Sequence, residues 1–437
     1  MTPLNDVSGQ NPRQIAAEIL LQRRPGGDFT EGLLERALAK ALLATVDRAL
    51  CQELVYGVVR WQAALDWLIS RKTDGREQKP GLQNLLRLGL YQIFWLDRIP
   101  DHAAVNQTVE LARQNGFDTQ TGFVNAVLRN YLRAAGETQK LLAALKISQP
   151  AVGWSHPEWL VARWQRRWGA EKMAQLLEWN NTPPKTFARV NRLKTEAGPL
   201  LDKWRAEGVE YDSVHRESLE ENLVFELKSH PPLTSLGSFQ QGGFYIQDPS
   251  TLVAPALLGA QPGETILDVC AAPGGKTTFL AQLMNNQGRI VAQDVSGDRL
   301  KLLRDNGERL GVTCVEPVLS SAFSLQPSTF DRILVDAPCS NTGVMRRRVD
   351  LRWRIQPEEM LRLQQTQLAL LEQAAARLKP GGVLVYSTCS LEPEENQEVV
   401  NRFLYQYPGF KPESERELVP FVNNLDGAFV ARLERRP

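Results

Sequence analysis

The chain lacks the cysteine and histidine patterns that mark disulfide-rich or zinc-binding proteins. Its five cysteines are scattered, odd in number and free of C-x-x-C spacing, and its four histidines lie far apart. Disulfide frameworks and zinc sites need paired or clustered ligands at short spacings. We therefore expect no bound metal, and we expect the protein to reside in the reducing cytoplasm.

Long apolar runs and a strong net charge are also missing. No apolar segment approaches the roughly 20 residues that cross a bilayer, and the first six residues do not resemble a signal peptide. We therefore expect no membrane partner, and a monomer is the default expectation. The net charge of +1 does not by itself indicate a nucleic-acid partner. The 437 residues exceed a single core and predict two or three domains.

The first predicted domain, residues 1–145, is all-α. Apolar residues recur at intervals of three and four across residues 12–145, for example at Leu85, Leu86, Leu90 and Ile93. Proline and glycine interrupt this periodicity and separate the helices. Strand-like alternation is absent over the same stretch.

Residues 150–240 are basic and rich in tryptophan, and form a predicted connecting region of mixed α and β structure. Five of the ten tryptophans are Trp154, Trp159, Trp164, Trp168 and Trp179. Arginines and lysines, including Arg163, Arg166 and Arg189, lie among and after them. Basic and aromatic residues together favour an RNA-binding surface. An amphipathic helix with tryptophans in the core and arginines in solvent is the equal alternative.

Strands and helices alternate from residue 262, which predicts a Rossmann-like α/β domain over residues 241–437 with a mostly parallel sheet. The predicted strands are 266–269, 289–292, 312–318, 333–335 and 383–386, with a long helix at 357–378. We expect the fourth and fifth strands to neighbour the first. Ligands of such sheets bind beyond the carboxyl ends of the strands.

A glycine-containing loop, DVCAAPGGKT at 268–277, joins the first of these strands to a helix. It is not a phosphate-binding Walker loop, because Cys270 stands where that motif needs glycine. Asp294 ends the second strand, where a carboxylate can accept both ribose hydroxyls of a nucleoside. Loop and acid together favour nucleoside binding over a tight turn without a ligand.

Two thiols follow strands of the same sheet, Cys339 in DAPCS (336–340) and Cys389 in STCS (387–390). Five arginines between residues 346 and 354 follow the first of them. Taken alone, the cysteine would be expected only to fill a loop, and the run of arginines would be expected to form a solvated surface. Together they favour a reactive site that faces an anionic polymer.

Two thiols suit methyl transfer to carbon 5 of a pyrimidine. A thiolate that adds to carbon 6 makes carbon 5 nucleophilic toward a methyl sulfonium, and a second group then helps to expel the thiolate. Asp336 is placed to hydrogen-bond the ring at N3. The base must leave the RNA stack to reach such a site.

These motifs resemble those of the Sun/RsmB family of rRNA cytosine-5 methyltransferases. The matching segments are DVCAAPGGKT (268–277), DAPCS (336–340), GVMRR (343–347), STCS with EEN (387–396), RVNRLK (189–194), QDPS (247–250) and DGAF (426–429). The helical part resembles the family's NusB-like RNA-binding module in RIPDHAAVN (98–106) and GFVNAVLR (122–129). The resemblance covers nearly the whole chain.

The resemblance implies a role for each matching residue. Cys389 would be the nucleophile, Cys339 would assist product release, and Asp336 would lie near both cofactor and base. S-adenosylmethionine would be the cofactor and 16S rRNA the substrate. The residues that would hold the cofactor are Cys270, Ala271, Ala272, Pro273, Gly274, Gly275, Lys276, Asp294, Ser321 and Asp336.

The sequence departs from the family at three places. Ser321 lies where family members usually carry an acid, Arg348-Val349 replaces a common His-Pro, and Ala428 replaces an aromatic. Three alternatives remain at this point. The target is another RNA such as tRNA or 23S rRNA, or the enzyme methylates DNA, or the chain is a non-catalytic RNA-binding factor.

Overall fold

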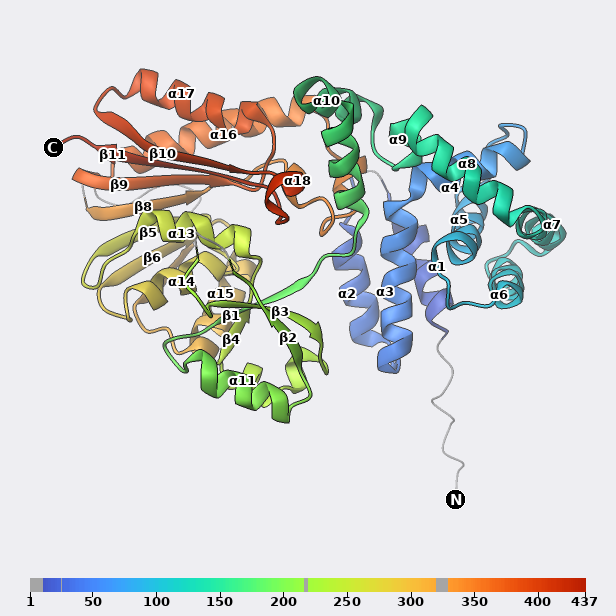
Figure 1. The fold of residues 1–437 in the computed structure, drawn as a ribbon, viewed down its shortest axis with the longest axis horizontal. Helices are drawn as coiled ribbons and strands as arrows, with labels where there is room; N and C mark the ends of the chain where they lie inside the picture. Colours follow the sequence, from blue (N-terminus) through green and yellow to red (C-terminus); the bar gives the residue numbers. More distant parts are fainter. Residues whose placement is uncertain (1–10, 25, 216–218, 320–328) are drawn as a thin grey trace. The chain divides into compact units, whose positions relative to one another are not determined.

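The computed structural model describes residues 11–24, 26–215, 219–319 and 329–437 (Figure 1). The chain forms two compact units. The helical unit comprises the residues up to Thr182 together with Met345–Arg354, and the second unit comprises Pro183–Val344 and Ile355–Pro437. The domain boundaries expected near residues 145–150 and 240 remain predictions.

The helical unit contains no strand among its described residues, which confirms the predicted all-α architecture. Its helices are α1 (Pro12–Gln22), α2 (Thr30–Lys40), α3 (Thr45–Arg60), α4 (Gln62–Lys72), α5 (Pro80–Trp95), α6 (Asp101–Gln114), α7 (Thr121–Arg133), α8 (Ala135–Ser148), α9 (Pro150–Gly153) and α10 (Glu158–Asn181). The periodic apolar residues of α1 to α7, among them Leu85, Leu86 and Leu90, are buried in one core. Burial of these faces is the main stabilising term of such a bundle.

The tryptophan-rich segment lies mostly in α10 (Glu158–Asn181). Trp164 is fully buried and the other four tryptophans of the segment are partly buried. Arg166 and Lys172 are exposed on the same helix. The tryptophans thus contribute to packing, as in the amphipathic alternative, whereas basic side chains remain on the surface.

A short segment that follows the Cys339 loop, Met345–Arg354, packs within the helical unit. The guanidinium of Arg352 is fully buried and donates to the carbonyls of Asn180 (2.9 Å) and Ser155 (3.2 Å) and to Oδ1 of Asn181 (2.7 Å). Asp350 accepts a hydrogen bond from the backbone N–H of Thr30 (2.8 Å), in the first turn of α2. The segment therefore fastens several helices to one another.

This packing corrects the sequence-based interpretations of the arginine run. Arg352 is fully buried and Arg346 is 2% exposed, with its guanidinium 4.0 Å from the ring centroid of Trp179. Of the five arginines in the run, only Arg348 is exposed. The run is therefore neither a solvated face nor a continuous surface for a polyanion, because buried acceptors bind part of it.

The second unit begins with a small α+β layer, as predicted. Its four strands are β1 (Thr186–Val190), β2 (Glu210–Ser213), β3 (Val224–Ser229) and β4 (Phe244–Ile246), in the antiparallel order β2-β3-β1-β4. Helix α11 (Ala197–Ala206) covers one face with the buried Trp204, which packs edge-on against Phe225 and Phe244. The short helix α12 (Gly237–Gln240) precedes β4.

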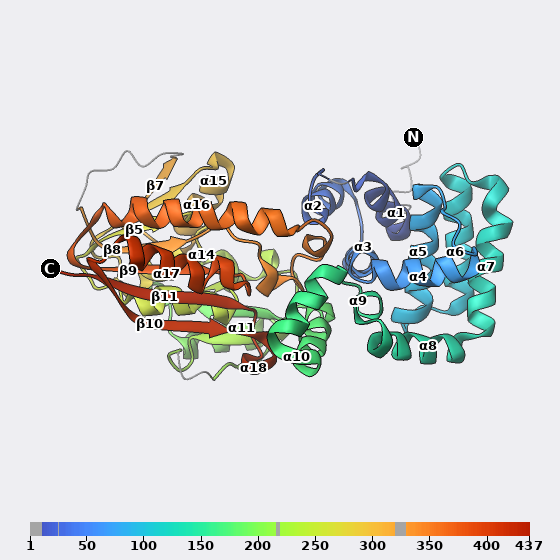
Figure 2. The same cartoon turned by 90° about the horizontal axis from the view of Figure 1, so that it is seen from above.

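A seven-stranded sheet dominates the second unit and confirms the predicted mostly parallel architecture (Figures 1 and 2). Its strands are β5 (Thr265–Val269), β6 (Arg289–Asp294), β7 (Val315–Leu319), β8 (Phe330–Asp336), β9 (Leu378–Thr388), β10 (Phe410–Leu418) and β11 (Ala428–Arg435). The order is β10-β11-β9-β8-β5-β6-β7. Strand β11 is antiparallel to both of its neighbours, β10 and β9, and the other adjacent pairs are parallel. The fifth predicted strand, β9, neighbours the fourth, β8, and not the first, β5, which corrects that expectation.

Helices cover both faces of this sheet. Helices α16 (Pro357–Ala375) and α17 (Gln397–Gln406) pack on one face, and α13 (Val253–Leu258), α14 (Gly275–Leu283) and α15 (Gly297–Leu310) pack on the other. The helix α18 (Pro420–Asn423) lies between β10 and β11 in the sequence. Because β5, β6, β8 and β9 are parallel, their carboxyl ends meet at one edge of the sheet.

A carboxyl group is buried in the central strand. Asp268 in β5 is fully buried, its Oδ2 accepts a hydrogen bond from Thr277 Oγ1 (2.6 Å), and its Oδ1 has no partner among the described residues. Burial raises the pKa of Asp268 from 3.8 to about 7, against the opposing hydrogen bond from Thr277. The folded protein therefore holds a proton that the unfolded chain releases.

The buried Arg352 predicts a large local cost for its removal. Arg352→Met leaves several buried acceptors unpaired and should lower the local stability of the helical unit by roughly 3 kcal/mol. Amide hydrogen exchange in α3 and α10 measures this, because a protein of two units need not unfold in one step. The exposed Arg348→Met is the matched control and should change exchange little. Equal protection in both variants would contradict the anchoring role.

The raised pKa of Asp268 predicts a stability that falls with pH. The pKa of Asp268 in the folded state lies above its unfolded value. Its contribution to the free energy of unfolding is therefore fully present below about pH 4 and is lost as pH rises to about 7. Asp268→Asn does not titrate, so its thermal midpoint should rise by several degrees relative to the wild type between pH 5 and pH 8. The exposed Asp305→Asn should show no such divergence. If the thermal midpoints of the wild type and Asp268→Asn changed with pH in parallel, the raised pKa of Asp268 would be refuted.

Candidate active site

The glycine loop passes from the end of β5 into α14 with two residues in the left-handed region. Cys270 has φ of 61° and Gly274 has φ of 104°, and α14 begins at Gly275. Only glycine adopts the second of these angles without strain. The loop thus brings the backbone of residues 270–276 and a helix N-terminus to the ligand edge of the sheet.

Arg189 supports this loop from the small sheet. The fully buried guanidinium donates to the carbonyl of Gly275 (2.9 Å), to Oε1 of Gln247 (2.6 Å) and to Oγ1 of Thr278 (3.0 Å). Sequence reasoning counted Arg189 among the basic residues of an RNA-binding region, and the structure corrects this. The arginine positions the loop and is inaccessible to a polyanion.

Asp294 ends β6 and also holds the loop. Its Oδ2 accepts from the backbone N–H of Ala272 (3.1 Å) and lies 3.4 Å from the guanidinium of Arg299, while its Oδ1 accepts from the N–H of Ser296 (3.0 Å). Arg299 also donates to the carbonyl of Ala272. The carboxylate expected to bind ribose is therefore already engaged with the loop, although each oxygen retains a further lone pair.

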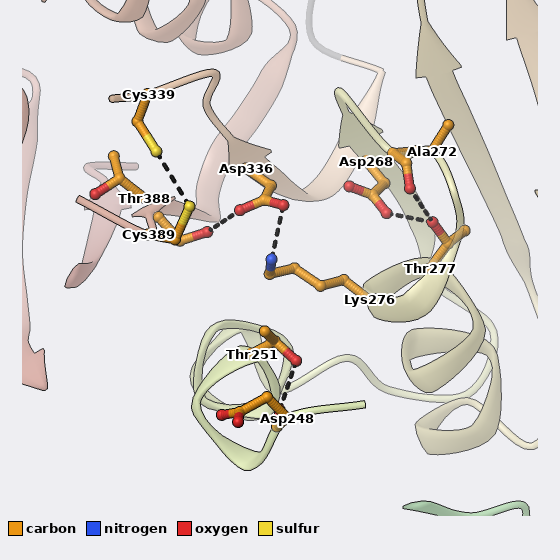
Figure 3. A network of polar contacts seen from close by, with 12 residues as sticks. Asp248, Thr251, Asp268, Ala272, Lys276, Thr277, Asp336, Cys339, Thr388 and Cys389 are labelled. Atoms are coloured by element: carbon orange, nitrogen blue, oxygen red, sulfur yellow. Dashed lines mark hydrogen bonds and ion pairs between the residues drawn. The ribbon is translucent and has the colours of Figure 1, made fainter. Parts of the chain in front are cut away.

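An ion pair connects the loop to the next strand. Lys276 Nζ lies 2.7 Å from Oδ2 of Asp336 at the end of β8 (Figure 3). Oδ1 of Asp336 accepts from Ser387 Oγ (2.8 Å) at the end of β9. Burial alone would lower the pKa of Lys276, but the Asp336 carboxylate outweighs this and the pKa is raised. Lys276 therefore keeps its proton, and a cationic donor stands beside Asp336.

The two predicted thiols face each other. Cys339 Sγ and Cys389 Sγ lie 3.3 Å apart, and Figure 3 shows them beside Asp336. Both are free cysteines, and Cys389 Sγ also donates to Oδ1 of Asn341 (3.0 Å). The hydrogen bond with Cys389 and then burial raise the pKa of Cys339 well above its usual value. Cys339 thus stays protonated at neutral pH.

A buried carboxylate that sequence reasoning did not single out joins the two thiol loops. Glu395 accepts from the N–H of Ser340 (2.8 Å) and from Ser390 Oγ (2.6 Å), and these serines directly follow the two cysteines. Gln367 of α16 donates to the same carboxylate (3.0 Å). In the sequence, Glu395 belongs to the EEN segment (394–396) that matches the family, and a serine follows each cysteine, but neither pattern shows that these residues are in contact.

The charges around the loop fit S-adenosylmethionine. Burial raises the pKa of Cys270 to about 12, and the carboxylates of Asp336, Asp294 and Asp268 raise it further. Lys276 and Arg299 pair with Asp336 and Asp294, so these three acids leave the loop with one negative charge when Asp268 is ionised, which suits a ligand with a sulfonium and an ammonium group. The unpaired Oδ1 of the buried Asp268 adds negative potential beneath the same loop once that carboxyl ionises. The residues present therefore fit the predicted cofactor.

Three remaining expectations have different outcomes. Ser321 lies outside the described residues. Over the part of the chain that the structure describes, no three histidine, cysteine or acidic residues gather as a metal site. Within the same residues, no helix combines the length and apolar character that a bilayer crossing requires.

Known proteins match all three parts of the chain. Residues 10–133 match the NusB family, residues 156–220 match the ferredoxin-like domain of RsmF/B-like methyltransferases, and residues 255–434 match the 16S rRNA methyltransferase RsmB/F family. The probable ribosomal RNA small subunit methyltransferase B of Bacillus subtilis is 36% identical, over 97% of this chain and 98% of that protein. The ribosomal RNA small subunit methyltransferase B of Cronobacter sakazakii is 36% identical over 96% of both.

A solved structure extends the match to the fold. The crystal structure of PH0851 superposes with a TM-score of 0.78 at 25% identity and covers 98% of this chain and 99% of that one. The cofactor is S-adenosylmethionine, as the family resemblance implied. The sequence identity of 36% over nearly the full length agrees with the three matched parts. The chain therefore belongs to the RsmB/F family of 16S rRNA methyltransferases.

Proposed function

We propose that this protein methylates carbon 5 of a cytosine in 16S rRNA through a covalent adduct with Cys389. The observation that carries the proposal is the 3.3 Å contact between two free thiols, Cys339 and Cys389, beside the Lys276–Asp336 pair. Methylation at a ring nitrogen or at a ribose hydroxyl needs no thiol pair. Carbon 5 of cytosine needs prior activation at carbon 6, which a thiolate supplies.

In the first step, Cys389 Sγ gives its proton to water and bonds, as a thiolate, to carbon 6 of the cytosine. The carbon 5–carbon 6 double bond opens, and its electrons move toward N3 and O2 of the ring. Asp336 and the protonated Lys276 form an ion pair of 2.7 Å that can hydrogen-bond this edge and stabilise the charge. Asn341 accepts from Cys389 Sγ at 3.0 Å and so orients the sulfur.

The bound S-adenosylmethionine supplies a methyl group on a positively charged sulfur. Carbon 5 would take this methyl group as the bond between the methyl carbon and the cofactor sulfur breaks, which leaves a neutral thioether. The hydrogen on carbon 5 must then leave as a proton, which passes to water. Loss of that proton restores the double bond, and the bond between Cys389 Sγ and carbon 6 breaks. The product is 5-methylcytidine, and Cys389 returns as a thiolate.

Cys339 assists the last step in this scheme. Its raised pKa keeps it protonated, so that its thiol can donate to the departing sulfur of Cys389 at a distance near 3.3 Å. Without this donor, the adduct forms but its breakdown slows. Glu395 keeps the two loops at this separation through its hydrogen bonds to Ser340 and Ser390.

The proposed reaction predicts both the product and the residue on which it depends. Unmodified 16S rRNA incubated with labelled S-adenosylmethionine should yield 5-methylcytidine on nucleoside analysis. Cys389→Ala should lower the rate by at least about a thousandfold, because the activating bond cannot form. Cys314→Ala, which removes another free cysteine of the same unit, is the control and should remain active. An active Cys389→Ala enzyme would refute the nucleophile, and a product on tRNA or 23S rRNA alone would redirect the substrate.

A trapped adduct is the expected result for Cys339→Ala. This variant should accumulate a protein–RNA complex that survives denaturing electrophoresis, because release slows while attack continues. The double variant Cys339→Ala/Cys389→Ala should form no such complex. A Cys339→Ala enzyme that turns over at the wild-type rate without an adduct would show that Cys339 has no part in release. No methylation of any RNA by the wild type would favour a non-catalytic RNA-binding factor.

A further inference from the structure

The helical unit contains a cavity of about 640 Å³ that the proposed reaction does not use. The end of α1, helix α4, the 73–78 segment and the start of α5 line it, together with Trp353 and Arg354. All of these residues belong to the helical unit. The volume lies within the range of small-ligand sites and is large enough for one nucleotide.

The lining of this cavity is rich in guanidinium groups. Its five arginines are Arg23, Arg24, Arg76, Arg87 and Arg354, and its two acids are Asp66 and Glu77. Asp66 pairs with Arg87 through two hydrogen bonds of 2.7 Å, and Asp350 lies 3.4 Å from Arg354. Arg23, Arg24 and Arg76 have no carboxylate within 4 Å among the described residues. The cavity thus carries positive charge that the helical unit does not neutralise.

Arg23 is the member of this cluster that most needs an anion. Its Nη1 donates to Oε1 of Gln62 (3.3 Å), but its Nε is buried and has no hydrogen-bond partner in the described part of the chain. Burial lowers the pKa of Arg23 to about 10; Asp350 opposes this shift, and Arg87 and Arg354 add to it. A buried, unpaired guanidinium nitrogen among like charges is costly, and a bound anion would offset the cost.

We propose that this cavity binds one nucleotide of a single-stranded RNA segment. Arg23, Arg24 and Arg76 hold the phosphate. The side-chain amides of Gln62 and Gln83, which also line the cavity, supply a donor and an acceptor for a base edge. The identification of RNA as the ligand rests on the proposed function. An acidic peptide is the less favoured ligand. Its carboxylates could bind the arginines, but it has no base edge for the side-chain amides of Gln62 and Gln83 to hydrogen-bond.

RNA binding by a charge-matched pair of double variants tests the proposal. Arg24→Gln/Arg76→Gln changes two exposed cavity arginines, and Arg113→Gln/Arg133→Gln changes two exposed arginines of the same unit outside the cavity. The probe is a fluorescein-labelled RNA of ten nucleotides, and anisotropy with the full-length protein gives Kd at several salt concentrations. The cavity variant should bind about tenfold or more weakly. Its slope of log K against log salt should be smaller by about 0.7, the value for one phosphate on a single strand, because the cavity holds one phosphate. The control variant should bind within about twofold of the wild type.

Three outcomes would overturn the inference. Equal weakening in both variants would mean that only total charge matters, and no weakening in either would mean that the cavity takes no RNA. Displacement of the probe by a glutamate decapeptide as readily as by unlabelled RNA would assign the cavity to acidic chains in general. Displacement by cytidine monophosphate at lower concentration than by inorganic phosphate would support the base contacts, and equal displacement would remove them.

Methylation kinetics separate this inference from the proposed function. The cavity variant should reach the wild-type kcat at a raised KM for RNA, because its catalytic unit is unchanged. A wild-type protein that binds the probe in this cavity but methylates no RNA would refute the proposed function alone. An unchanged KM in the cavity variant, with an active wild type, would refute the cavity alone.

Discussion

The two thiols face each other because a single buried carboxylate binds the loops that carry them. Glu395 is fully buried and accepts hydrogen bonds from Ser340 and Ser390, which directly follow Cys339 and Cys389. Burial raises the pKa of Glu395, and these donors oppose the shift. A buried carboxylate is retained only when such donors satisfy it. The separation of the thiols therefore depends on a residue that takes no part in the chemistry.

Buried arginines serve a similar purpose elsewhere. Arg189 binds the carbonyl of Gly275 and the hydroxyl of Thr278, and thereby supports the loop that faces the cofactor. Arg352 binds carbonyls of the helical unit. Each guanidinium offers five donors in a fixed plane, which lets one side chain satisfy several carbonyls at once. Lysine could not make the same set of contacts.

The sequence predicted the helices and strands better than it predicted which charged side chains are buried. Apolar periodicity located the helices of residues 12–145, and strand–helix alternation predicted the parallel sheet. The motifs around Cys339 and Cys389 predicted that the two loops that carry these cysteines meet at the carboxyl edge of the sheet. Three features could not be read in the same way. The position of β9 beside β8 depends on packing across the whole sheet. A charged side chain such as Arg189 is predicted to lie on the surface unless its buried acceptors are known. The inclusion of Met345–Arg354 in the helical unit is a long-range contact that no local pattern encodes.

The net charge of +1 conceals two opposite local fields. Three acids, Asp268, Asp294 and Asp336, surround the loop of the second unit against two cations, Lys276 and Arg299, where the ligand carries positive charge. Unneutralised guanidinium groups gather in the cavity of the helical unit, which we assign to an anion. A uniformly basic surface would attract RNA but would also weaken the binding of a sulfonium near the same field. A cationic cofactor and a polyanionic substrate are thus each met by charge of the opposite sign, carried by different units of the chain.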